Sequence, residues 1–312
     1  MSTSLVLMSK LAAMMLMVIV GYGAVKFHAV QSGDSRILSR LIVYIMQPCL
    51  ICRSFQIELT PERMTGFLCA LGLGFGTYLL WIAALGILKK PLKLDAIDRC
   101  SMIYSNVGNL ALPLINMLLG SEYVFYASAL QVPFNLLIWT HGNSVISGEK
   151  RLHFKKIMLN PNMIALMAGL LLTALRIRLP DFLDTAMEGL GSMVGPCSML
   201  VIGMVITTSN LSKVFINRRA YFVSFGRLLV MPASLLLLFL ATGIFNSHPE
   251  LVPVFQVCFI ALSTPVASTV SQLAVLYNNK AYETSLYSLI SMAFCVVTMP
   301  LMLAVFQMLF VK

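Results

Sequence analysis

Eight stretches of this chain contain no Asp, Glu, Lys or Arg, and each is at least 19 residues long. A membrane-spanning helix needs about 20 predominantly apolar residues. Hydrophobic residues make up 59% of the chain and charged residues 11%, whereas soluble domains average roughly 45–50% and 25%. The pattern predicts an integral membrane protein and excludes a soluble enzyme or a nucleic-acid binder. The eight stretches are 64–88, 100–121, 123–148, 157–175, 189–212, 228–249, 251–279 and 284–311.

Two further apolar segments complete the set of predicted spans. Residues 5–25 and 37–56 each span the bilayer if the basic residues in them extend their charged ends to the interface. Ten spans of about 20 residues each occupy roughly two thirds of the chain, which leaves no room for a soluble domain. We therefore expect an all-α integral membrane protein with ten transmembrane helices.

The basic residues indicate an orientation. Each loop is named by the two spans that it connects. Fifteen Lys and Arg residues lie on the side of loops 1–2, 3–4, 5–6, 7–8 and 9–10, and six lie on the opposite side. Lys and Arg accumulate in cytoplasmic loops. We expect both termini outside, in the plasma membrane, which in a bacterium is the inner membrane.

Landmarks recur at a nearly constant offset between the two halves of the chain. Pro48-Cys49 in the second span recurs as Pro196-Cys197 in the seventh, 148 residues later, and Pro113 in the fourth recurs as Pro265 in the ninth, 152 residues later. The predicted repeats are residues 1–148 and 149–312. Because each contains five spans, the second repeat must cross the membrane in the opposite sense, as in many transporters.

The fourth and ninth spans carry polar residues and proline in the middle of apolar segments. Proline removes a helix hydrogen bond, and backbone freed at membrane depth must line a cavity or be buried in protein. Two broken helices at matching positions indicate a substrate site at the midplane; the alternative is a packing kink in each helix. The candidate substrate-binding residues are Asn106, Asn109, Pro113, Ser263, Thr264, Pro265, Ser268 and Thr269.

At these residues the chain resembles the auxin efflux carrier family. Asn106 lies seven residues before a Pro113-Leu pair, with Ala111 where the family usually has glycine, and segments 276–285 and 297–301 resemble the family's C-terminal end. The resemblance implies that the two broken helices cross. It also implies a scaffold domain of spans 1, 2, 6 and 7, a moving transport domain of spans 3–5 and 8–10, and a homodimer joined through the scaffold.

The charged and polar residues within spans narrow the chemistry. None of the 12 acidic residues falls at mid-membrane in this assignment, which argues against a carboxylate-based ion antiporter and suits an anion site. Arg227 either complements the anion or, the interpretation we favour, extends to the cytoplasmic interface. Gln131 and Asn135 are interpreted as helix–helix hydrogen bonds, and Cys49-x-x-Cys52 as packed thiols. No histidine pair has metal-ligand spacing, so we expect no metal and no cofactor.

The sequence therefore predicts a secondary carrier for a small organic anion, of the carboxylate class, that works by alternating access in the direction of efflux. It predicts neither an enzyme nor a nucleic-acid partner. The alternative is a membrane sensor or scaffold that binds a ligand without transporting it. The sequence does not identify the particular carboxylate or the coupling ion.

Overall fold

A computed structural model describes residues 3–58, 60–148, 159–207, 217–244 and 248–311. These residues form helices joined by short turns, and the described part of the chain contains no β-strand. One isolated antiparallel β-bridge, between Ser105 and Val266, joins two segments that interrupt helices.

The first half of the chain folds into helices of unequal length. The helices that follow one another from the N-terminus are α1 (Thr3–Lys26), α2 (Ser35–Leu41), η2 (Ile42–Met46), α3 (Gln47–Ser54), α4 (Pro61–Leu88), α5 (Ala96–Ile103), η3 (Val107–Ala111), α6 (Leu112–Leu118), α7 (Ser121–Ala129), α8 (Gln131–Leu137), η4 (Ile138–Gly142) and α9 (Asn143–Ser147).

The second half repeats this mixture of continuous and interrupted helices. Its helices are α11 (Pro161–Ala174), α12 (Asp181–Ser192), α13 (Val194–Ile206), α15 (Arg218–Phe225), η5 (Gly226–Val230), α16 (Met231–Thr242), α18 (Val252–Leu262), α19 (Ser268–Leu276) and α20 (Ala281–Phe310).

Four helical segments of the described chain are long and apolar enough to cross a bilayer. They are Ser32–Ser54, Pro61–Leu88, Arg218–Thr242 and Ala281–Phe310, and four shorter apolar helices accompany them. The chain is therefore an all-helical, multi-pass membrane protein. The arrangement as ten spans in two inverted repeats stays a prediction.

Helices begin earlier than the uncharged stretches suggested. The fourth predicted span was 100–121, but α5 begins at Ala96, and the eighth was 228–249, but α15 begins at Arg218. Asp95 and Asn217 accept hydrogen bonds from backbone N–H groups in these first turns. Such caps start a helix with polar residues. The first turns of these helices therefore contain charged side chains, which the uncharged stretches had placed outside the span.

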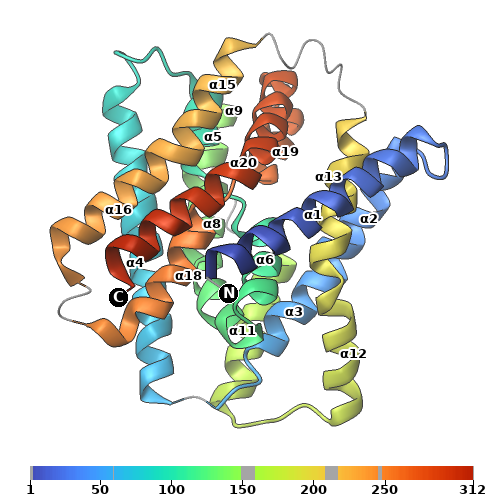
Figure 1. Cartoon of the computed structure of the whole chain (residues 1–312), viewed down its shortest axis with the longest axis vertical. Coiled ribbons are helices and arrows are strands. Elements are labelled where there is room, and N and C mark those ends of the chain that lie inside the picture. Colours follow the sequence, from blue (N-terminus) through green and yellow to red (C-terminus); the bar gives the residue numbers. More distant parts are fainter. Residues whose placement is uncertain (1–2, 59, 149–158, 208–216, 245–247, 312) are drawn as a thin grey trace.

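The helices gather in two groups that lie side by side (Figure 1). α1, α2, α3, α12 and α13 lie to the right in this view, and α4, α15, α16 and α18 to the left. Within the first group α1 packs against α13, which it crosses in Figure 1. Gly21 and Gly203 face the partner helix so closely that a Cβ atom at either position would overlap its backbone.

Candidate substrate-binding site

The two interrupted helices meet at their interruptions. The N–H of Asn106 donates to the carbonyl of Pro265 at 3.0 Å, and the N–H of Ala267 donates to the carbonyl of Tyr104 at 3.0 Å. Each interruption thereby supplies partners for backbone groups that the other has released from a helix. This exchange satisfies the requirement that irregular backbone in a membrane be bonded inside the protein.

Neighbouring helices hold this junction from both sides. The hydroxyl of Tyr78, on α4, lies 2.7 Å from the Ser105 hydroxyl. The N–H of Val266 donates to the hydroxyl of Ser291, on α20, at 3.2 Å. Both contacts are buried, so the junction is a fixed feature of the helix packing.

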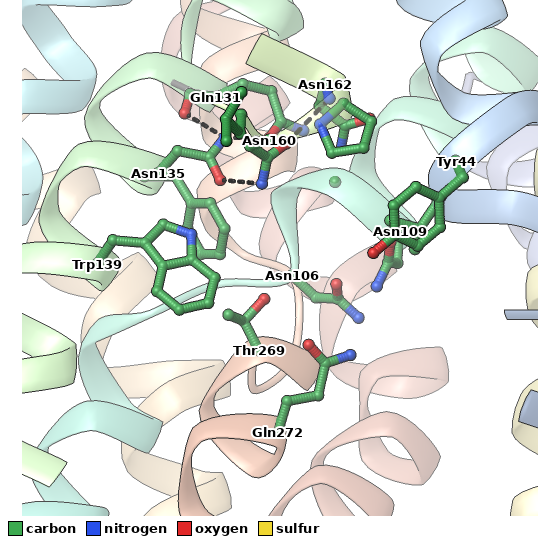
Figure 2. A pocket seen from close by; sticks show the side chains of 15 residues that line it. Tyr44, Asn106, Asn109, Gln131, Asn135, Trp139, Asn160, Asn162, Thr269 and Gln272 are labelled. Carbon is green, nitrogen blue, oxygen red and sulfur yellow. Dashed lines mark hydrogen bonds between the residues drawn. The ribbon is translucent and has the colours of Figure 1, made fainter. Parts of the chain in front are cut away.

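A cavity of about 600 Å³ lies beside the junction (Figure 2). Carboxamide side chains dominate its polar lining, and none of the described residues that line it is charged. Asn135 accepts a 3.3 Å hydrogen bond from the amide of Asn160. The side chains shown in Figure 2 include Tyr44, Asn106, Asn109, Gln131, Asn135, Trp139, Asn160, Asn162, Thr269 and Gln272.

A second cavity of about 310 Å³ shares part of this lining. Asn106, Asn109 and Gln272 line both cavities. The polar side chains of the second cavity are mainly serine hydroxyls, and the lining residues that the structure describes include no charged one. The serines are Ser39, Ser198, Ser268, Ser271, Ser285 and Ser288.

The N-terminal ends of two interrupted half-helices face these cavities. Asn106 precedes the half-helix formed by η3 and α6, and Ser268 begins α19. The amide of Asn109 donates to the Ser268 hydroxyl at 2.7 Å, which joins the two ends. The first N–H groups of a helix lack partners within it, and they carry the positive end of the helix dipole.

The structure places the predicted site residues in two sets. Asn106 and Asn109 line both cavities, Thr269 lines the first and Ser268 the second. The other four are absent from both linings and lie buried in or next to the interrupted helices. These four are Pro113, Ser263, Thr264 and Pro265.

Several cavity residues escaped the sequence analysis. Gln131 and Asn135 were interpreted as helix–helix hydrogen bonds. Asn135 does accept one from Asn160 at the start of α11, and both residues also line the first cavity. Asn160 and Asn162 were not considered as site residues. Asn160 caps α11 by accepting from the N–H of Asn162 at 2.9 Å. The Asn-Pro-Asn sequence marks the start of a helix, but nothing in it indicates whether that start faces a cavity.

Arg227 differs from both sequence interpretations. Its side chain is fully buried, so it does not extend to an interface, and it lines neither cavity. The guanidinium instead donates to backbone carbonyls at the junction, among them Thr264 at 2.9 Å. We therefore do not assign it to the substrate.

Asp98 was assigned to a loop, but it is almost fully buried in the first turn of α5. Its carboxylate accepts from Arg219 Nη2 at 2.5 Å and Nε at 3.1 Å. It also accepts from the Tyr287 hydroxyl at 3.0 Å and from the N–H of Asp95 at 3.0 Å. The ion pair links α5 to α15, and the tyrosine hydrogen bond adds α20 to the same cluster. Among the described residues no cluster of His, Cys, Asp or Glu could hold a metal ion.

Long apolar helices around uncharged polar cavities, at the point where two interrupted helices meet, define the class of multi-pass membrane transport proteins. A family model described as membrane transport protein matches residues 6–153 and again residues 149–303. The chain belongs to this family, which is that of the auxin efflux carriers and whose members are transporters. No curated protein matches the chain.

Proposed function

We propose that this protein is a secondary carrier for a small organic anion of the carboxylate class. The proposal depends on the first cavity. Carboxamide side chains line it, and so do residues at the N-terminal ends of two half-helices. Helix N-termini favour anions because their N–H groups and dipoles point at the ligand. A carboxylate in the lining would repel such a ligand, and the described part of the lining has none.

The size and position of the cavities support this substrate class and an alternating-access mechanism. Sites for small molecules commonly measure about 300–1,000 Å³. Val43 lies on η2, between α2 and α3 of the first helix group, and lines both cavities. Asn106, Asn109 and Gln272, at or near the two interruptions, line both cavities as well. A movement of the first group against the interrupted helices would change access to a site that all four residues share, as in carriers built from repeats.

The finer features belong to the same proposal. They are the inverted repeats 1–148 and 149–312, the scaffold of spans 1, 2, 6 and 7, the homodimer, the outside termini in the plasma membrane and transport as efflux. The basic-residue distribution supports the orientation, and the two helix groups support the division into scaffold and transport domains. A sensor that binds the same anion without moving it is the second candidate, and transport assays separate the two.

The first prediction concerns transport and its charge. In proteoliposomes, a panel of labelled carboxylates should include one whose flux produces a current without sodium or a proton gradient, because no described residue that lines the cavities has a carboxylate to carry a proton. One elementary charge moving through 100 mV corresponds to about 2.3 kcal/mol. An inside-negative potential of that size should favour outward movement roughly fortyfold.

Flux measurements and solid-supported-membrane electrophysiology test this prediction on the same vesicles. Protein-free vesicles are the control. Electroneutral transport, or transport that stops without sodium, would contradict uncoupled movement but not the carrier. Saturable binding of a carboxylate with no flux in either direction would instead favour the sensor.

The second prediction concerns the site. Asn106→Ala and Asn109→Ala should each weaken carboxylate binding by roughly tenfold or more, because a hydrogen bond to a charged group contributes roughly 1.5–3 kcal/mol and about 1.4 kcal/mol is tenfold. Scintillation-proximity binding measures the change. Asn116→Ala, on the same half-helix but outside both cavities, is the matched control. If all three variants bound the carboxylate with the affinity of the wild type, neither Asn106 nor Asn109 would belong to the site.

A further inference from the structure

The guanidinium of Arg227 lies where the C-terminal ends of two half-helices converge. Nη1 donates to the carbonyls of Met102 and Ile103 at 3.0 and 3.1 Å. Nε donates to the carbonyl of Thr264 at 2.9 Å, and Nη2 donates to the carbonyl of Leu262. Four of its five N–H donors are thus used on backbone oxygens, and the side chain is fully buried.

All four carbonyls lie at or just after the C-terminal end of a half-helix. Met102 and Ile103 are the last residues of α5, Leu262 is the last residue of α18, and Thr264 follows it in the interruption. The last carbonyls of a helix have no partner within it, and they form the negative end of its dipole. In carriers with broken helices, such ends and the unwound carbonyls beside them coordinate monovalent cations.

The charge of Arg227 has no acidic partner in the part of the chain that the structure describes. Among the described residues, no ion pair includes it. Its other neighbour of note is the ring of Trp81, whose centroid lies 5.0 Å from the guanidinium carbon and whose indole N–H donates to the Ser234 hydroxyl at 2.9 Å. A buried charge persists only when such groups offset its lost hydration, so carbonyl dipoles and an aromatic face take the place of a carboxylate.

The backbone around Arg227 brings it to this place. Arg227 lies in η5, a π-helix, and π-bulges recur at functional sites. The preceding residue, Gly226, faces the side chain of Met102 so closely that an added Cβ atom would overlap it. The absence of a side chain at Gly226 lets η5 approach the end of α5, which places the guanidinium within reach of both half-helices.

We propose that the carbonyls at the ends of α5 and α18 form a monovalent-cation site, and that Arg227 is a tethered cation that fills it in place of a bound metal ion. Arg227 is then a positioning residue, because it holds the two interruptions together without touching the substrate cavities. If the protein is the proposed carrier, its transport then requires no metal cation at the junction, and this consequence rests on the proposed carrier function. The cation site itself does not, and it can be tested without a substrate.

The test measures thermal unfolding of the purified full chain in detergent. Arg227→Ala is compared with the wild type and with Arg178→Ala, which removes an exposed arginine outside the site. Each protein is heated in dilute guanidinium, sodium, potassium or N-methylglucamine chloride at equal ionic strength. In N-methylglucamine, Arg227→Ala should unfold at a midpoint lower by roughly 5 °C or more. Guanidinium should restore most of this loss in a saturable manner, while the wild type and Arg178→Ala respond equally to all four salts.

Restoration by sodium or potassium would also support the site, and restoration by none of the three small cations would overturn it. A wild-type midpoint that rises with sodium but not with N-methylglucamine would overturn the claim that Arg227 replaces the metal ion. If Arg227→Ala yields no folded protein, Arg227→Lys and Arg227→Met decide. Arg227→Lys should give the higher yield and midpoint because it keeps the cation, and equal values for the two would overturn the proposal.

Discussion

Asp98→Ala should lower the free energy of unfolding by roughly 3 kcal/mol, the lower end of the range for breaking a buried ion pair from one side, because Asp98 is buried but Arg219 is partly exposed. The Arg219 guanidinium would lose its carboxylate, and the Tyr287 hydroxyl and the N–H of Asp95 would lose an acceptor. Because this cluster joins α5, α15 and α20, its loss should loosen the first half of an interrupted helix. The thermal midpoint in detergent should fall on the order of 10 °C.

Asp95→Asn is the matched control for this prediction. Asp95 lies three residues away and pairs with Lys280 at 2.6 Å, but both side chains are partly exposed. Burial opposes its ionisation, yet hydrogen bonds from Lys280 and from backbone N–H groups outweigh that effect and lower the pKa of Asp95. Asparagine keeps the helix cap, and an exposed pair contributes at most about 1 kcal/mol. Equal midpoints for the two variants would show that the buried pair adds no more than a surface pair.

Gly203→Ala should destabilise the protein by about 3 kcal/mol, the upper part of the range for overpacking. The added methyl group would overlap the carbonyl oxygen of Val18 and lie 2.6 Å from the backbone nitrogen of Tyr22. Both contacts are with the backbone of α1, so no side-chain rotation can relieve them. The two helices must separate along their shared face. Thermal unfolding in detergent measures the loss.

Gly86→Ala provides the comparison, because it adds the same methyl group to a helix at a position with open space around it. Its effect should stay within about 1 kcal/mol in either direction, the size of the intrinsic helix preference. If Gly203→Ala were as mild as Gly86→Ala, the close approach of α1 to α13 would be refuted.

Part of the candidate site could be predicted because proline and clustered polar residues mark a broken membrane helix wherever its neighbours lie. Asn106, Asn109, Ser268 and Thr269 were found in this way, and all four line a cavity. Asn160 was not, because an N-cap asparagine has the same local sequence whether or not it faces a cavity. Its place beside Asn135 arises from the packing of α11 on α8.

The sequence alone determined the helical membrane class, the family and the two interrupted helices. These depend on composition and local backbone chemistry, which act on neighbouring residues. Only the tertiary structure decided the role of Arg227, whose carbonyl partner Met102 lies 125 residues away, and the burial of Asp98, whose partner Arg219 lies 121 residues away. A charge inside a helix can reach an interface, a ligand or a set of carbonyls, and helix packing selects among them because it alone determines which polar groups lie within hydrogen-bond distance.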